Sequence, residues 1–160
     1  MSNGYDGRMA DKDQAVQPPA RLRRLASWQA NKVSTLGARL TARRMPLGAR
    51  SDFAVLAALE EYGELSQADI GRRLGLDRND VNGVLNRLES RDQVSRAADP
   101  ANRRRNIVTL SSVGRRYLAE LQDHADVVQG ELLAGLDPLE RDQLCSLLAK
   151  VLEGHSPQSA

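Results

Sequence analysis

The segment from 66 to 110 constrains the fold of this 160-residue chain more than any other part of the sequence. Ser66 and Asp69 have the spacing of a capping box, which predicts a short helix that follows Ser66 and ends at Gly75. Asp77 is placed to cap a second helix directly afterwards. Two helices joined by a tight turn that contains glycine form a helix-turn-helix.

The second of these helices, which is predicted to run to about Ser90, has one apolar and one polar face. The apolar stripe recurs at helical spacing and consists of Val81, Val84, Leu85 and Leu88. The residues that face outwards are then Arg78, Asn79, Asn82, Asn86 and Arg87. Asparagine is a poor helix former, so three of them in one exposed row indicate a recognition surface. The alternative is an ordinary solvated helix face.

After Arg91 the apolar pattern changes from the helical period to the alternation of a strand. Residues 94–97 and 106–110 are predicted strands, and the polar segment 98–104 joins them in a hairpin. A helix-turn-helix followed by a basic hairpin is a winged helix. Four further amphipathic helices are expected at about 21–44, 51–62, 111–135 and 137–153. The predicted fold class is mostly α with a small β-wing, a winged helix-turn-helix with long flanking helices.

Charge is segregated along the chain, although the net charge is only +2. Residues 20–50 contain eight basic and no acidic residues, and residues 66–116 contain eleven arginines against six acidic residues. Residues 117–160 contain two basic and eight acidic residues. This pattern indicates one face suited to a polyanion and another kept away from it. Solvated helix faces are the alternative.

Several functional classes are not expected. The single Cys145 excludes an internal disulfide framework and is compatible with a reducing cytoplasm. Its neighbours in the last helix are leucines, which predicts a small buried apolar residue. His124 and His155 lie far apart without a cysteine pair, so no metal or other cofactor is expected. No membrane span, secretory signal or catalytic signature is found, so we expect a soluble cytoplasmic protein that is not an enzyme.

Residues from about 51 to 121 resemble the MarR (multiple antibiotic resistance regulator) family of winged-helix regulators. The resemblance rests on the stretches 53–59, 65–70, 76–81, 85–89, 99–105 and 108–114. The order Asp-Pro-x-Asn-Arg-Arg in the wing, followed by Thr-Leu-Ser at a helix start, is specific. Two residues depart from the family's pattern. Gly83 stands where the family often has a basic residue, and Asp80 where it often has a small hydroxyl residue.

The resemblance implies that the partner is double-stranded DNA, with the second helix in the major groove and the wing in the adjacent minor groove. Base contacts are expected from the outward row, because asparagine pairs well with adenine and arginine with guanine. The residues of this row are Arg78, Asn79, Asn82, Asn86 and Arg87. In the wing, Arg103, Arg104 and Arg105 are expected to reach a narrow minor groove. Asp99 is expected to stiffen the wing by pairing with one of them, first of all Arg103.

Ser66 and Gln67 are expected to contact phosphates, because both lie at a helix N-terminus. The resemblance also implies a homodimer that holds two recognition helices about one DNA turn apart on a pseudo-palindromic site. A larger monomeric helical domain is the alternative. Many relatives bind a small aromatic or phenolic effector between the dimerisation and DNA-binding parts. Here such a cleft would draw on Trp28, Arg39, Arg43, Phe53 and His124, each of which also has an ordinary core or surface interpretation.

The expected organisation has five parts. They are a flexible tail over 1–19, a dimerisation helix over 20–46, the DNA-binding winged helix-turn-helix over 47–110, C-terminal dimerisation helices over 111–155 and a flexible tail over 156–160. The expected function is a sequence-specific, homodimeric transcriptional repressor that a small molecule releases from its operator. The rival hypotheses are a ligand-independent DNA-binding regulator, a winged-helix protein-interaction module and a catalytic protein without a recognisable site.

Overall fold

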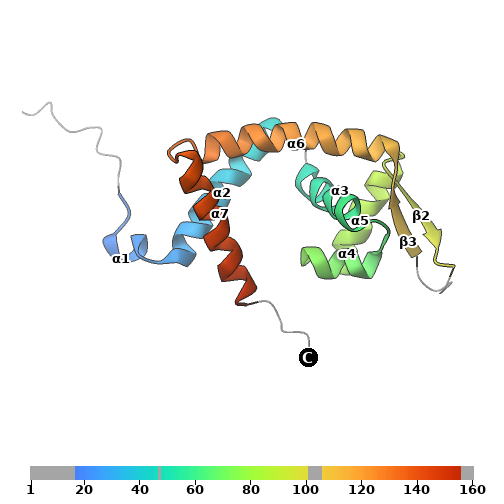
Figure 1. Ribbon diagram of the computed structural model, residues 1–160, viewed down its shortest axis with the longest axis horizontal. Helices are drawn as coiled ribbons and strands as arrows, with labels where there is room; N and C mark the ends of the chain where they lie inside the picture. Colours follow the sequence, from blue (N-terminus) through green and yellow to red (C-terminus); the bar gives the residue numbers. More distant parts are fainter. Residues whose placement is uncertain (1–16, 47, 101–105, 156–160) are drawn as a thin grey trace, which may run out of the picture. The chain divides into compact units, whose positions relative to one another are not determined.

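The computed structural model describes residues 17–46, 48–100 and 106–155. These residues form mainly helices and one small antiparallel sheet, as the sequence predicts (Figure 1). The chain divides into two units, Met1–Thr35 and Leu36–Ala160, which are described separately. The elements are α1 (Ala20–Arg23), α2 (Ala26–Arg44), α3 (Ala49–Tyr62), β1 (Leu65–Ser66), α4 (Gln67–Leu74), α5 (Arg78–Glu89), β2 (Val94–Ala98), β3 (Asn106–Leu110), α6 (Ser112–Leu132) and α7 (Pro138–Glu153).

The described part of the first unit corrects the prediction of one uninterrupted N-terminal helix. The helix is broken at Arg24 and Leu25, between α1 and α2. The Pro19 carbonyl accepts the N–H groups of Leu22 and Arg23, at 2.9 and 3.2 Å, so α1 is a single tight turn. The Gln29 amide then donates to the Arg23 carbonyl at 3.0 Å, which satisfies an acceptor that the interrupted helix leaves open.

The helix-turn-helix in the second unit forms where the sequence predicts it. Ser66 and Asp69 make the capping box of α4, and Gly75 ends that helix with the left-handed φ of 65°. The Asp77 carboxylate caps α5 by accepting the Asp80 N–H at 2.8 Å. These local interactions determine where each helix starts, and therefore which face of α5 is buried.

The sheet has the strand order β1-β3-β2. Leu65 of β1 pairs with Val108 of β3, and Val94 of β2 pairs with Leu110 of β3. Strand β1 was not predicted from the sequence, because two residues are too few to show an alternating pattern. Its pairing attaches the start of α4 to the base of the wing.

One hydrophobic core holds α3, α4, α5, the sheet and the start of α6 together. Its most deeply buried large side chains include Leu56, Ile70, Leu85, Leu88 and Leu121. Helix α3 begins at Ala49 instead of the predicted Ser51. In Figure 1 this part of the second unit gathers at the N-terminal end of α6, and α7 follows its C-terminal end.

The last helix has an unexpected environment for its cysteine. Asp137, Pro138 and Glu140 start α7 as predicted, with a capping box and a proline in the first turn. Cys145 is exposed, however, and not buried. The reason is that no residue of α7 is fully buried, and most of its large apolar side chains are exposed. None of the described helices combines the length and the apolar character that crossing a membrane would require.

Candidate nucleic-acid interface

Helix α5 presents the polar row that its sequence predicts. The stripe of Val81, Val84, Leu85 and Leu88 is buried in the core. On the opposite face, Arg78, Asn79, Asn82 and Asn86 are exposed. The helix therefore shows a surface of amide and guanidinium groups, which can donate and accept hydrogen bonds at base edges.

The two departures from the family's pattern also lie on α5. Apart from its own helix backbone and chain neighbours, a Cβ added at Gly83 would meet no heavy atom within 4 Å, so packing does not require glycine there. Asp80 is exposed in the first turn of α5, where a negative charge matches the helix dipole. Gly83 thus removes a side chain from the exposed face of α5, and Asp80 places an acid near the start of its polar row.

A groove lies beside the first turns of α4 and α5. It consists of two hollows that share Gln67 and Arg78 in their linings. The first is also lined by Asp69, Arg72 and Asn106, and the second by Asn79 and Asn82. The second hollow has amide and guanidinium groups and no acid, so it suits an anion such as phosphate. Gln67 is half-buried and lies where a backbone contact was predicted.

Ser66 is the N-cap of α4, as predicted, and it lines the same groove. Its side chain is buried, with 4% of the residue exposed. Its hydroxyl accepts the Asp69 N–H at 3.2 Å and donates to the Asp69 carboxylate at 2.5 Å. The hydroxyl is therefore used in the cap of α4, and the expected phosphate contact of Ser66 stays a prediction.

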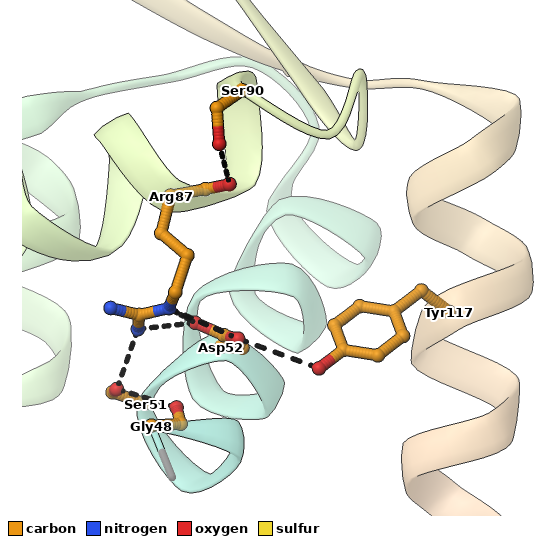
Figure 2. Close-up of polar contacts among 6 residues, drawn as sticks. All are labelled: Gly48, Ser51, Asp52, Arg87, Ser90 and Tyr117. Carbon is orange, nitrogen blue, oxygen red and sulfur yellow. Dashed lines mark hydrogen bonds and ion pairs between the residues drawn. The ribbon is translucent and has the colours of Figure 1, made fainter. Parts of the chain in front are cut away.

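Arg87 was predicted to face DNA, but its side chain is directed elsewhere. Its guanidinium turns away from the exposed row towards α3, where Nη2 lies 2.5 Å and Nε 3.0 Å from Oδ1 of Asp52 (Figure 2). The Asp52 side chain is only 2% exposed and that of Arg87 is 32% exposed. A buried carboxylate needs a charged partner, and on α5 Arg87 supplies it. The sequence pattern gave the face of the helix correctly but could not show that this long side chain bends inwards.

The Asp52–Arg87 pair also reaches α6. The Tyr117 hydroxyl donates to Oδ2 of Asp52 over 3.5 Å, and Nη2 of Arg87 lies 3.4 Å from the Ser51 hydroxyl (Figure 2). Burial, and then the neighbouring Asp52 carboxylate, raise the pKa of Tyr117. Gly48, with a φ of 87°, caps α3 beneath the guanidinium, and a Cβ there would lie 3.1 Å from Arg87. This cluster fixes α5 against α3 and α6.

Arg96 is a residue of this surface that the sequence analysis missed. It projects from β2 onto α5, where Nη2 lies 2.6 Å from Oδ1 of Asn86 and Nη1 lies 3.4 Å from Oδ1 of Asn82. Nη2 and Nε also contact Oε2 of Glu89, at 2.5 and 3.0 Å. Hydrogen bonding from Arg96 is the main cause that lowers the pKa of Glu89. A charged residue within a predicted wing strand was the signal that could have identified it.

The tip of the wing lies outside the described residues. Arg103, Arg104 and Arg105 belong to the segment 101–105, so their minor-groove contacts and the Asp99–Arg103 pair stay predictions. The base of the wing is well anchored. The Ser111 hydroxyl donates to the Asp92 and Gln93 carbonyls, at 2.6 and 3.0 Å, before α6 begins.

The residues expected around an effector lie in both units. Trp28 belongs to the first unit, where Lys32 Nζ lies 5.2 Å from the centroid of its ring system. In the second unit, Phe53 packs against the core, and Arg39, Arg43 and His124 are exposed. Among the described residues, no group of three or more His, Cys, Asp and Glu side chains could hold a metal ion.

Comparison with known proteins places this surface in context. Residues 49–105 match the model of the MarR family. Over 101 residues the chain is 30% identical to the HTH-type transcriptional repressor NicR of Pseudomonas putida, which covers 63% of the chain and 64% of NicR. The chain thus spans slightly less than two thirds of that relative.

Two solved structures are similar over more of the chain. The Bordetella bronchiseptica protein BpsR, whose DNA binding is regulated by 6-hydroxynicotinic acid, is 28% identical with a TM-score of 0.69, covering 78% of this chain and 96% of BpsR. A probable transcriptional regulator from Pseudomonas aeruginosa is 32% identical with a TM-score of 0.73, covering 82% of this chain and 99% of the other.

Proposed function

Since this chain belongs to the MarR family of winged-helix transcriptional regulators, we propose that it is a sequence-specific repressor that binds double-stranded DNA as a homodimer. The observation that carries the proposal is the exposed row of Arg78, Asn79, Asn82 and Asn86 on α5. The similarity to the repressor NicR supports the same direction of regulation. Such a repressor would act on the chromosome, in the cytoplasm, and would need no catalytic group.

In the proposed complex, α5 lies in the major groove with its exposed row against base edges. The groove lined by Gln67 and Arg78 receives a backbone phosphate. Arg103, Arg104 and Arg105 of the wing enter the neighbouring minor groove, where the negative potential is high. Arg87 is left out of this interface, because its guanidinium is paired with Asp52. Ser66 lines the groove at the N-cap of α4.

The proposed dimer is supported by the apolar surface of α7. Five large apolar side chains of this helix are between 47% and 70% exposed, and they are Leu139, Leu147, Leu148, Val151 and Leu152. A contiguous apolar surface of this kind marks an interaction site. A second copy would cover it and would place two recognition helices on a pseudo-palindrome.

Regulation by a small molecule is the least specified part of the proposal. It is supported by BpsR, whose DNA binding responds to 6-hydroxynicotinic acid, an aromatic acid. In the second unit Arg39 and Arg43 would attract an acid group, and Phe53 and His124 would offer ring surfaces. Release from DNA requires that the effector bind the DNA-incompetent state more tightly than the competent one.

The test begins with selection of bound fragments from genomic DNA, followed by affinity measurements by fluorescence anisotropy. Asn82→Ala should weaken the selected site more than random DNA, and Gln122→Ala, which removes an exposed amide on α6, should change neither. Arg103→Ala with Arg104→Ala should weaken the selected site by about tenfold or more, since each lost phosphate or groove contact reduces the electrostatic term. Wild-type binding with no preference among duplexes would refute the proposal.

Salt separates DNA binding from the main rival, a protein-interaction module. Affinity for the selected duplex should fall steeply with salt, because each neutralised phosphate releases counterions. An interaction module would show little DNA affinity at any salt concentration. A regulator controlled only by its abundance would bind DNA with the same salt dependence and would not respond to aromatic acids.

A further inference from the structure

We propose that Arg96 is a positioning residue for base recognition: it orients the amides of Asn82 and Asn86 so that they donate to base edges and do not read adenine in the usual bidentate way. This inference rests on the proposed function. It assigns a specificity-determining role to a residue on the wing strand that faces α5.

The backbone of β2 holds Arg96 in place. Arg96 pairs with Val108 of β3, and Val94, two residues earlier, is buried in the core. Side chains two residues apart in a strand share a face, so Arg96 projects towards the same side as Val94, where α5 lies. The side chain of Arg96 is only 20% exposed, which leaves it little freedom to turn to solvent.

Glu89 holds the guanidinium over the exposed row. Its Oε2 accepts from both Nε and Nη2 of Arg96, at 3.0 and 2.5 Å. This charge-assisted pair occupies the Nε–Nη2 edge of the guanidinium, and the Glu89 carboxylate offsets the charge of Arg96. Arg96 therefore enters the DNA surface as a fixed hydrogen-bond donor to its neighbours on α5, and its charge is compensated before any phosphate arrives.

The chemistry of the guanidinium fixes the orientation of the two amides. A guanidinium has donors and no acceptor, so any asparagine amide that contacts it must present its oxygen. Oδ1 of Asn86 lies 2.6 Å from Nη2, and Oδ1 of Asn82 lies 3.4 Å from Nη1. The amide NH₂ groups are then left to donate elsewhere. The effect is strong at Asn86 and weak at Asn82, because the first distance is much the shorter.

An amide held in this way favours a particular base edge. Reading adenine requires the amide oxygen to accept from N6 while the NH₂ donates to N7. At Asn86 one of the two lone pairs of that oxygen accepts from Arg96 at 2.6 Å, which turns the oxygen towards β2 and leaves the NH₂ as the group that faces a base, so adenine loses its advantage. Guanine offers two acceptors, N7 and O6, and thymine offers O4, whereas the exocyclic amine of cytosine opposes a donor. We therefore expect guanine or thymine, in place of adenine, at the base position that Asn86 contacts.

The experiment is a selection from a randomised duplex library with four full-length proteins: wild type, Asn86→Ala, Arg96→Met and Arg73→Met. Asn86→Ala identifies the base position that Asn86 reads, because preference is lost there. Arg96→Met frees the amide oxygen and should raise the affinity for adenine at that position, relative to guanine or thymine, by about threefold or more. Arg73→Met removes an equal charge from α4, where Arg73 lies over the Tyr62 ring. It should leave the base ranking unchanged.

The outcomes distinguish this inference from the proposed function. A wild type that selects no duplex refutes the proposed function. A selective wild type whose base ranking at the Asn86 position is the same in Arg96→Met refutes the inference alone. The inference is also refuted if Arg96→Met loses base preference at a position where Asn86→Ala keeps it, because Arg96 would then read that base itself. If Arg96→Met does not fold by circular dichroism, Arg96→Lys replaces it. Lysine keeps the charge but cannot hold Glu89 and Asn86 together in the arginine geometry, so the same shift is expected.

Discussion

Removing either member of the Asp52–Arg87 pair should destabilise the winged helix, and the two losses should differ in size. The Asp52 side chain is 2% exposed and that of Arg87 is 32% exposed. In Arg87→Met the carboxylate stays buried with the Tyr117 hydroxyl, 3.5 Å away, as its remaining side-chain partner. In Asp52→Asn the guanidinium can turn to water, and the amide can still accept a hydrogen bond.

The burial of the two side chains and the usual cost of breaking a buried ion pair set the expected losses of stability. An uncompensated buried charge costs about 3–5 kcal/mol, so Arg87→Met should lower the free energy of unfolding by about 3 kcal/mol. Hydrogen bonds to a charged group contribute about 1.5–3 kcal/mol, and the low end is the expectation for Asp52→Asn, because the amide can still accept and the Arg87 guanidinium can rehydrate. The double variant should regain about half or more of the Arg87→Met loss, because no buried charge is left.

Urea unfolding followed by circular dichroism at one protein concentration measures these losses. The Arg44–Glu131 ion pair is the matched control, because both side chains are 41% exposed. Arg44→Met should cost less than about 1 kcal/mol. Equal losses for the two members of the Asp52–Arg87 pair, or a larger loss for Asp52→Asn, would refute the reasoning from burial.

The same variant also tests whether Arg87 contacts DNA. If Arg87 stays out of the DNA interface, folded Arg87→Met keeps the wild-type dependence of DNA affinity on salt concentration.

Three further predictions concern other parts of the chain. Gly83→Ala should raise the free energy of unfolding by about 1 kcal/mol in urea unfolding, since the Cβ meets open space and alanine is the better helix former; a loss of stability would show that the position is more crowded than described. Arg96 lowers the pKa of Glu89 from its ordinary value of 4.5, so the ionised carboxylate stabilises the fold. Above pH 4.5 the wild type should therefore have a higher free energy of unfolding than Glu89→Gln, by less than about 1 kcal/mol. This difference should shrink as the pH falls below 4.5. A constant difference in acid titrations of stability would contradict this. Leu148→Glu should shift the sedimenting species towards monomer, and Glu60→Gln, on an exposed site of α3, should not.

Much of the fold could be predicted because its signals are local. The caps at Ser66, Asp77, Ser111 and Asp137 lie within three residues of the groups they bind, so sequence spacing reveals them. The break of the N-terminal helix was missed, because it depends on backbone hydrogen bonds to the Pro19 carbonyl and not on the apolar period. Strand β1 was missed because its two residues are too few to show an alternating pattern and its partner, β3, is distant in sequence.

The site was predicted less completely than the fold, for a related reason. Helical periodicity places Asn82 and Asn86 on the exposed face, but it does not say what a long flexible side chain does. Arg87 pairs with Asp52, 35 residues away, and Arg96 reaches across from another element. Such tertiary pairs depend on how α3, α5 and β2 pack, which no local pattern encodes.

The bare apolar face of α7 has a consequence for how much of this protein a cell can use. A helix that buries none of its own residues gains its packing energy only when another surface covers it. In the proposed dimer, dilution would reduce folded stability as well as the occupancy of DNA, and solitary chains with exposed leucines would be substrates for aggregation or degradation. The amount of protein made would thus set a threshold, below which neither a stable pool nor the proposed repressor is available.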